Sequence, residues 1–127
     1  MGTSGVRMEE LVRFIISTAI VAMALVTASC GKVQNKVTVV NNSALRADRV
    51  TFTVCGKDVV FENLDAGKKQ SRSFSVTGDS GFSVSASLSD GTVATNSFGY
   101  VTGGAGAYGN HAEIEIAPDK SIKGKQL

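Results

Sequence analysis

Residues 82–89 alternate strictly between apolar and hydroxyl side chains, and this alternation constrains the fold more than any other feature of the chain. Successive side chains of a β-strand point to opposite faces, so the pattern predicts a strand with one face in a core and the other in water. A helix would spread the same apolar side chains around its circumference. The side chains expected in the core are Phe82, Val84, Ala86 and Leu88, and the expected solvent row is Ser83, Ser85, Ser87 and Ser89.

The same two-residue period recurs in shorter segments along the chain after residue 36. Turn-forming residues such as Gly56 and the pair Asp90–Gly91 separate these segments, as hairpins require. No segment after residue 30 has the 3.6-residue apolar spacing over ten or more residues that predicts a helix. The other expected strands centre on residues 37–39, 50–54, 59–61, 74–76, 93–101 and 112–116.

About seven short strands spaced roughly ten residues apart predict an all-β domain over residues 37–117. The expected architecture is a single antiparallel β-sandwich of immunoglobulin-like or transthyretin-like type, and a small β-barrel is the alternative. The 127-residue chain, 43% hydrophobic, has room for one such core. Residues 118–127 are rich in lysine and lack apolar periodicity, which predicts a basic flexible tail.

Residues 1–29 have the three parts of a secretory signal peptide. Arg7 and Arg13 precede the uncharged apolar segment 14–26, and the small residues 27–29 follow it. The apolar segment falls short of the roughly 20 residues that a transmembrane helix needs to cross a bilayer. We therefore expect a helical signal peptide that is removed from the mature protein, and an uncleaved membrane anchor is the alternative.

The end of this segment, residues 26–30 with the sequence VTASC, resembles the lipobox of bacterial lipoproteins. The resemblance covers about thirty residues, and Thr27 stands where leucine is common in that family. It implies that Cys30 is acylated by chains such as palmitate and becomes the first residue of the mature protein. Two or three chains hold a protein on a bilayer, because each buried CH₂ contributes about 0.8 kcal/mol. Residues 30–36 are then the lipidated cysteine and a short tether.

The resemblance also indicates where the protein resides. In such lipoproteins an aspartate after the cysteine often retains the protein at the inner membrane, and this chain has Gly31. We therefore expect lipid anchoring in the cell envelope, with the outer membrane favoured over the inner one and the periplasmic or external side left open. With Cys30 acylated, Cys55 is the remaining thiol of an oxidising compartment, so no intramolecular disulfide is expected. Cys55 is expected to be a small strand residue, and a reactive thiol is the alternative.

The sequence contains few residues that combine into a catalytic or metal-binding set. Zinc needs several cysteines or histidines at characteristic spacings, whereas His111 is the single histidine. The basic residues form no stripe and tryptophan is absent, which argues against nucleic-acid binding. We therefore expect no enzyme, cofactor or metal. The alternative is a small envelope enzyme or metal carrier that uses His111 with Cys55 or Glu113.

The glycine-rich segment Gly99–Gly109 is expected to be a flexible hairpin loop. A phosphate-binding loop would need a Gly-Lys-Ser/Thr ending and a following helix, and the segment has neither. Tyr100 and Tyr108 place amphipathic rings on this permissive backbone, as recognition loops do, although one of them packing on the sandwich edge is the alternative. The sequence thus predicts a lipid-anchored envelope module that presents a β-sandwich, and these tyrosines, to an unidentified envelope protein or surface ligand.

Overall fold

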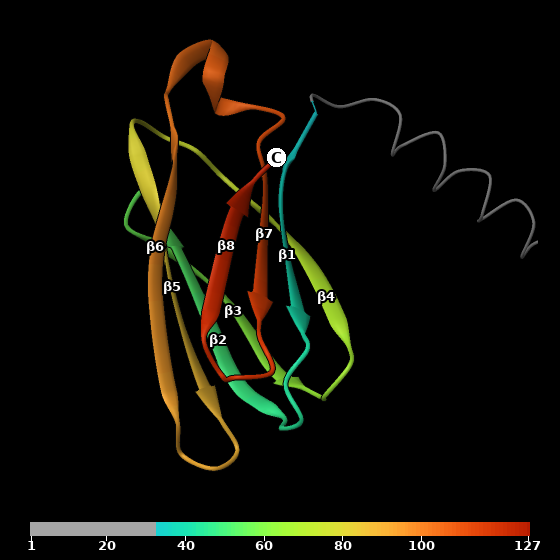
Figure 1. The fold of residues 1–127 in the computed structure, drawn as a ribbon. Coiled ribbons are helices and arrows are strands. Elements are labelled where there is room, and N and C mark those ends of the chain that lie inside the picture. The colour runs from blue at the N-terminus through green and yellow to red at the C-terminus, as the bar shows by residue number, and fades with distance from the viewer. Residues whose placement is uncertain (1–32) are drawn as a thin grey trace, which may run out of the picture. The chain divides into compact units, whose positions relative to one another are not determined.

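The computed structural model describes residues 33–127, which form one compact unit (Figure 1). The predicted signal peptide and Cys30 lie outside the described residues. Within residues 33–127, no helix has the length and apolar composition needed to span a bilayer. The elements are β1 (Asn35–Asn41), β2 (Ala47–Val54), β3 (Lys57–Leu64), β4 (Lys69–Phe74), β5 (Ser80–Leu88), β6 (Val93–Val101), the 3₁₀ turn η1 (Gly104–Ala107), β7 (His111–Ile116) and β8 (Ile122–Gln126).

The strands form two four-stranded sheets that pack face to face, so the predicted β-sandwich is confirmed (Figure 1). Sheet A has the order β4-β1-β7-β8, and sheet B has the order β3-β2-β5-β6. The small barrel does not form, because the strands of residues 33–127 belong to two separate sheets. Pairing is antiparallel as predicted except between β1 and β7, which run parallel with Val39 opposite Ile114. A parallel pair can form here because the chain crosses from sheet B to sheet A before β7, so that β7 enters sheet A in the same direction as β1.

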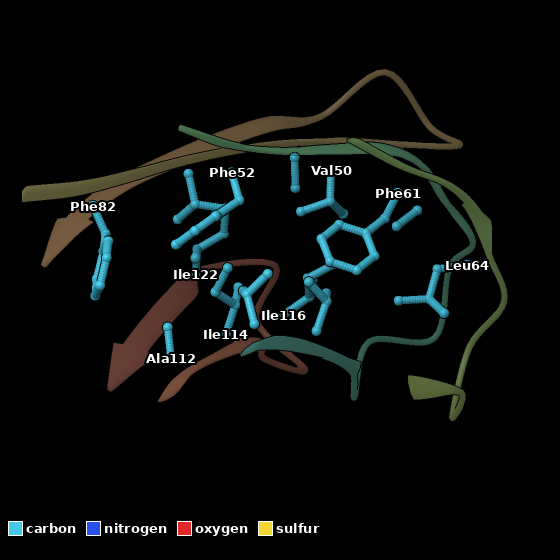
Figure 2. Close-up of a cluster of buried hydrophobic side chains, with 14 of the residues drawn as sticks. Val50, Phe52, Phe61, Leu64, Phe82, Ala112, Ile114, Ile116 and Ile122 are labelled. Carbon is cyan, nitrogen blue, oxygen red and sulfur yellow. The ribbon is translucent and has the colours of Figure 1, made fainter. Parts of the chain in front are cut away.

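The strand predicted from the alternation at residues 82–88 is confirmed in β5, where all four apolar side chains are buried. Beside it, β2 contributes Phe52, whose ring centroid lies 5.1 Å from that of Phe82 and 5.3 Å from that of Phe74. Sheet A supplies the opposite wall of this core, including Ile114 (Figure 2). The core therefore consists of the inward faces of both sheets, as a sandwich requires.

The first strand and the fourth strand begin earlier than predicted. β1 starts at Asn35, ahead of the predicted start of the domain at residue 37. β4 spans Lys69–Phe74 instead of centring on residues 74–76, and Phe74 is its buried side chain. Most of the β4 side chains are exposed, so this segment of the sequence carries no apolar alternation.

Cys55 lies in a turn between β2 and β3, so its prediction as a strand residue is wrong. Its φ is 53° and that of Gly56 is 73°. Two successive positive φ angles are what a two-residue hairpin turn needs to match the twist of its strands. The hairpin predicted from Asp90–Gly91 is confirmed between β5 and β6, with Gly91 at φ 87°.

The predicted flexible tail, residues 118–127, is wrong over half its length, because β8 pairs with β7 at the edge of sheet A. Ile122 is the buried side chain of this strand. Gly124 packs against the ring of Phe98 from β6, and a Cβ at this glycine would overlap that ring. The last strand therefore joins the two sheets along one side of the sandwich.

Gly124→Val is expected to lower the free energy of unfolding by about 1–3 kcal/mol, because the new side chain needs space that the Phe98 ring occupies. Lys123→Val is the matched control, since this neighbouring side chain is exposed. Its substitution should change stability by less than about 0.5 kcal/mol. Urea denaturation followed by circular dichroism measures both variants. Equal stabilities would show that β8 does not pack against β6.

Candidate functional site

Tyr100 and Tyr108, the predicted partner-binding residues, both have exposed rings. Their exposed fractions are 58% and 51%. Tyr100 lies near the end of β6, and Tyr108 lies in the loop that connects β6 to β7. The end of β6 and this loop occupy the same end of the sandwich (Figure 1). The structure therefore brings the two tyrosines to one end of the domain.

The segment Gly99–Gly109 is a crossover between the sheets, so its prediction as a hairpin loop is wrong. β6 ends at Val101 in sheet B, and β7 begins at His111 in sheet A, with η1 between them. A hairpin would instead join two antiparallel neighbours within one sheet. The predicted mobility of this segment stays a prediction.

Asn35 ties the crossover to the beginning of β1, although its side chain is only 4% exposed. Its Nδ2 donates hydrogen bonds to the main-chain oxygens of Ala107, at 2.7 Å, and of Phe74, at 3.2 Å. Its Oδ1 accepts from the main-chain and side-chain nitrogens of Asn110, both at 2.9 Å. A buried amide needs such partners, because leaving it unpaired costs about 1–3 kcal/mol. The loop that carries Tyr108 is thus fixed to sheet A through Asn35 of β1.

The main chain of Tyr100 is held by the side-chain amide of Gln126 from β8. The Oε1 of Gln126 accepts from the Tyr100 N–H at 2.9 Å, and its Nε2 donates to the Tyr100 oxygen at 2.8 Å. The preceding Gly99 has φ 69°, and a Cβ there would lie 2.7 Å from the Phe82 ring. Glycine therefore permits the local backbone, while Gln126 holds the next peptide and leaves the tyrosine ring exposed.

The structure does not gather the residues of the alternative catalytic or metal site. His111 and Glu113 lie on the exposed side of β7, and Glu113 is directly opposite Lys125 of β8. Cys55 lies in the β2–β3 turn of the other sheet. In the described part of the chain, no three His, Cys, Asp or Glu side chains are grouped so that they could hold a metal ion.

The Cys55 thiol contacts main-chain groups of the segment that precedes β5. Its Sγ donates to the oxygen of Gly78 at 3.3 Å, and its own N–H donates to Oγ of Ser80 at 2.9 Å. Hydrogen bonding with the main chain of Thr77 lowers the pKa of Cys55 below its ordinary value, and desolvation opposes this effect. No charged side chain contributes to that lowering. These contacts suit a small residue in a tight turn.

One surface was predicted only in part, namely the outer face of sheet B. The sequence predicts the serine row of β5, and the structure adds threonines of β2 and β6 on either side of it. Thr51 lies opposite Ser85, which in turn lies opposite Thr95. The threonines of β2 could have been predicted from the sequence, because residues 50–54 alternate between apolar residues and threonine. This hydroxyl face lines a shallow depression of about 420 Å³ and consists of Thr51, Thr53, Ser83, Ser85, Thr95 and Ser97.

The described residues thus define a two-sheet β-sandwich with a hydroxyl-lined sheet face and two exposed tyrosines at one end. No protein-family model and no curated protein sequence matches the chain. Among solved structures, an NMR structure of a protein from Eubacterium rectale is similar, with a TM-score of 0.55 and 16% sequence identity. The similarity covers 76% of this chain and 91% of that chain. At such low identity it shows the fold alone.

Proposed function

We propose that this chain is a lipid-anchored, non-catalytic module of the bacterial cell envelope, which presents its β-sandwich at the membrane surface to a protein partner or a surface ligand. The observation that carries the proposal is the lipobox-like sequence 26–30, which ends at Cys30. Only four residues, 31–34, separate this cysteine from β1. A domain that begins so close to an acylated cysteine is held beside the bilayer. The outer membrane is the proposed location because Gly31 follows the cysteine.

The placement of the reactive side chains supports a role without catalysis. Cys55 lies in a turn of sheet B, whereas His111 lies on the exposed side of sheet A. Glu113 and Glu115 lie opposite Lys125 and Lys123, so each carboxylate has a cation as its cross-strand neighbour. Opposite charges in this register stabilise an exposed sheet face, which accounts for the two glutamates without a reaction.

Two surfaces of the described domain are suited to contact with another molecule. The hydroxyl face of sheet B offers hydroxyl groups at regular cross-strand spacing over a shallow depression. The end that carries Tyr100 and Tyr108 offers aromatic rings held on a supported backbone. Rigid aromatic anchors of this kind contribute strongly to binding, because little side-chain freedom is lost.

Metabolic labelling of the intact chain in bacteria with a fatty-acid probe tests the proposed function. We expect the probe to enter the protein, and mass spectrometry should show a mature chain that begins at Cys30 with diacylglycerol on its Sγ. Separation of inner and outer membranes should place the labelled protein in the outer fraction. A mature chain that begins at any other residue, or one without label, would refute the proposal.

A further inference from the structure

The exposed large apolar side chains of the described domain gather at one end. Of the five such side chains, Val93 lies at the opposite end, where β6 begins. The others surround the beginning of β1, which Figure 1 shows beside the end of β8 and the β6–β7 loop. We call this end the anchor pole, and its exposed apolar side chains are Val33, Tyr100, Tyr108 and Leu127.

Hydrogen bonds link the segments of the anchor pole to one another. The N–H of Gly109, the neighbour of Tyr108, donates to the oxygen of Val33 at 3.2 Å. The main chain of Tyr100 is held by Gln126 of β8 at 2.8 and 2.9 Å. The N–H of Leu127 donates to the oxygen of His111 at 2.9 Å, which joins the end of β8 to the start of β7, just after the loop of Tyr108.

The length of the chain before Val33 determines what can lie next to this surface. Three peptide units separate Cys30 from Val33, so the two Cα atoms are at most about 11 Å apart in any conformation. A protein partner between the anchor and the pole would take up all of this distance, since even one helix with its side chains is about 10–12 Å wide. In contrast, the nine residues of β5 extend about 30 Å toward the opposite end of the sandwich.

We propose that the anchor pole rests on the lipid headgroup region, with Tyr100, Tyr108 and Val33 as the residues that enter it. This inference rests on the proposed acylation of Cys30 and names the surface that the tyrosines contact. Tyrosine suits this position because its ring prefers an apolar environment while its hydroxyl stays hydrated, and tyrosine is enriched at membrane interfaces. The lipid chains on Cys30 then hold the protein to the bilayer at one point, and the side chains of the anchor pole hold it at further points. Together these contacts set the orientation of the sandwich on the membrane.

The charges near the pole agree with a phospholipid surface. Lys36 at the start of β1 is exposed and suits anionic headgroups, whereas the exposed Lys125 near the end of β8 lies opposite Glu113. The nearby carboxylate of Asp79 already accepts a hydrogen bond from the Gly103 N–H at 3.1 Å. The hydroxyl face and the far end of the sandwich would then remain accessible to other envelope components.

The natural chain contains no tryptophan, so a single introduced tryptophan reports its own environment without background. Tyr108→Trp and Tyr100→Trp place the probe at the anchor pole, and Val93→Trp is the matched control at the opposite end, where the side chain is 63% exposed. Each full-length variant is expressed in bacteria, purified as the processed protein and reconstituted into vesicles of phosphatidylethanolamine and phosphatidylglycerol. Parallel vesicles contain phosphatidylethanolamine with brominated acyl chains, which quench tryptophan on contact.

We expect brominated vesicles to remove most of the emission of the Tyr108→Trp and Tyr100→Trp variants and to leave that of Val93→Trp unchanged. If all three emit equally in both kinds of vesicle while the protein carries the fatty-acid label, the pole does not contact lipid, and the proposed anchoring function still stands. Crosslinking of the pole to a protein in place of quenching would likewise overturn the inference. A chain without fatty-acid label would refute both proposals. The two tyrosine positions are independent, so one variant suffices if the other fails to fold.

Discussion

Replacing Cys30 with serine is expected to abolish fatty-acid labelling of the chain and to leave its precursor uncleaved. The reason is chemical, because the diacylglycerol is transferred to a thiol sulfur, and a serine hydroxyl is a much weaker nucleophile than a thiolate. By resemblance to lipoproteins, the signal peptidase cuts before the modified cysteine only, so residues 1–29 should remain attached. Metabolic labelling with a fatty-acid probe and the mass of the intact chain measure the two effects.

Cys55→Ser is the matched control, since it removes the other cysteine of the chain and keeps the lipobox-like sequence. The serine hydroxyl can replace the thiol as the donor to the oxygen of Gly78, so the turn between β2 and β3 should persist. This variant should label as strongly as the parent. Undiminished labelling of Cys30→Ser, or its loss in Cys55→Ser, would show that Cys30 is not the acylated residue.

Strands could be predicted from the sequence wherever one face is buried and the other is in water. β5 is the clearest case, because from Phe82 to Leu88 its buried side chains alternate without a break with exposed or half-buried ones. The same period identified β2 and β7, each of which lies inside its sheet and packs one face against the core. Side-chain direction in a strand has a period of two, so the burial pattern appears directly in the residue order.

The edge strand β8 could not be predicted by the same reasoning, because it buries little apolar surface. Ile122 is its buried side chain, and the next core-facing position is Gly124, which the Phe98 ring covers. Two of the lysines that suggested a mobile tail are cross-strand neighbours of acidic residues, with Lys123 opposite Glu115 and Lys125 opposite Glu113. Their pattern is that of a solvated sheet face, and only the pairing with β7 distinguishes it from a tail.

The exposure of the candidate tyrosines could be predicted, but not the contacts that support them. Asn35 is a polar residue at a core position, and its partners lie 39 and 72 or more residues away in the sequence. Asn41, at the other end of β1, is fully buried and donates to the oxygen of Leu64, 23 residues away, at 2.9 Å. Such bonds depend on which loops meet in space, so residue type and spacing do not indicate them.

Phe52→Ala is expected to lower the free energy of unfolding by about 3–5 kcal/mol, the largest stability effect of a single substitution considered for this domain. The ring is fully buried between Phe82, at 5.1 Å, and Phe74, at 5.3 Å. Alanine removes both aromatic contacts and leaves a cavity at the junction of the two sheets. Domains of this size are commonly stable by about 5–15 kcal/mol, so the variant should unfold at a much lower urea concentration.

Thr51→Ala is the matched control for this prediction, because the preceding side chain on β2 points to the hydroxyl face of sheet B. Its loss removes no core contact and should cost less than about 1 kcal/mol. The chain lacks tryptophan, so tryptophan fluorescence cannot report unfolding, and circular dichroism is used to follow both transitions. A shift of β2 by one residue would exchange the two side chains between core and solvent. Similar destabilisation by both substitutions, or a larger effect at Thr51, would therefore show that the register of β2 differs from the one in which Phe52 faces Val84 of β5.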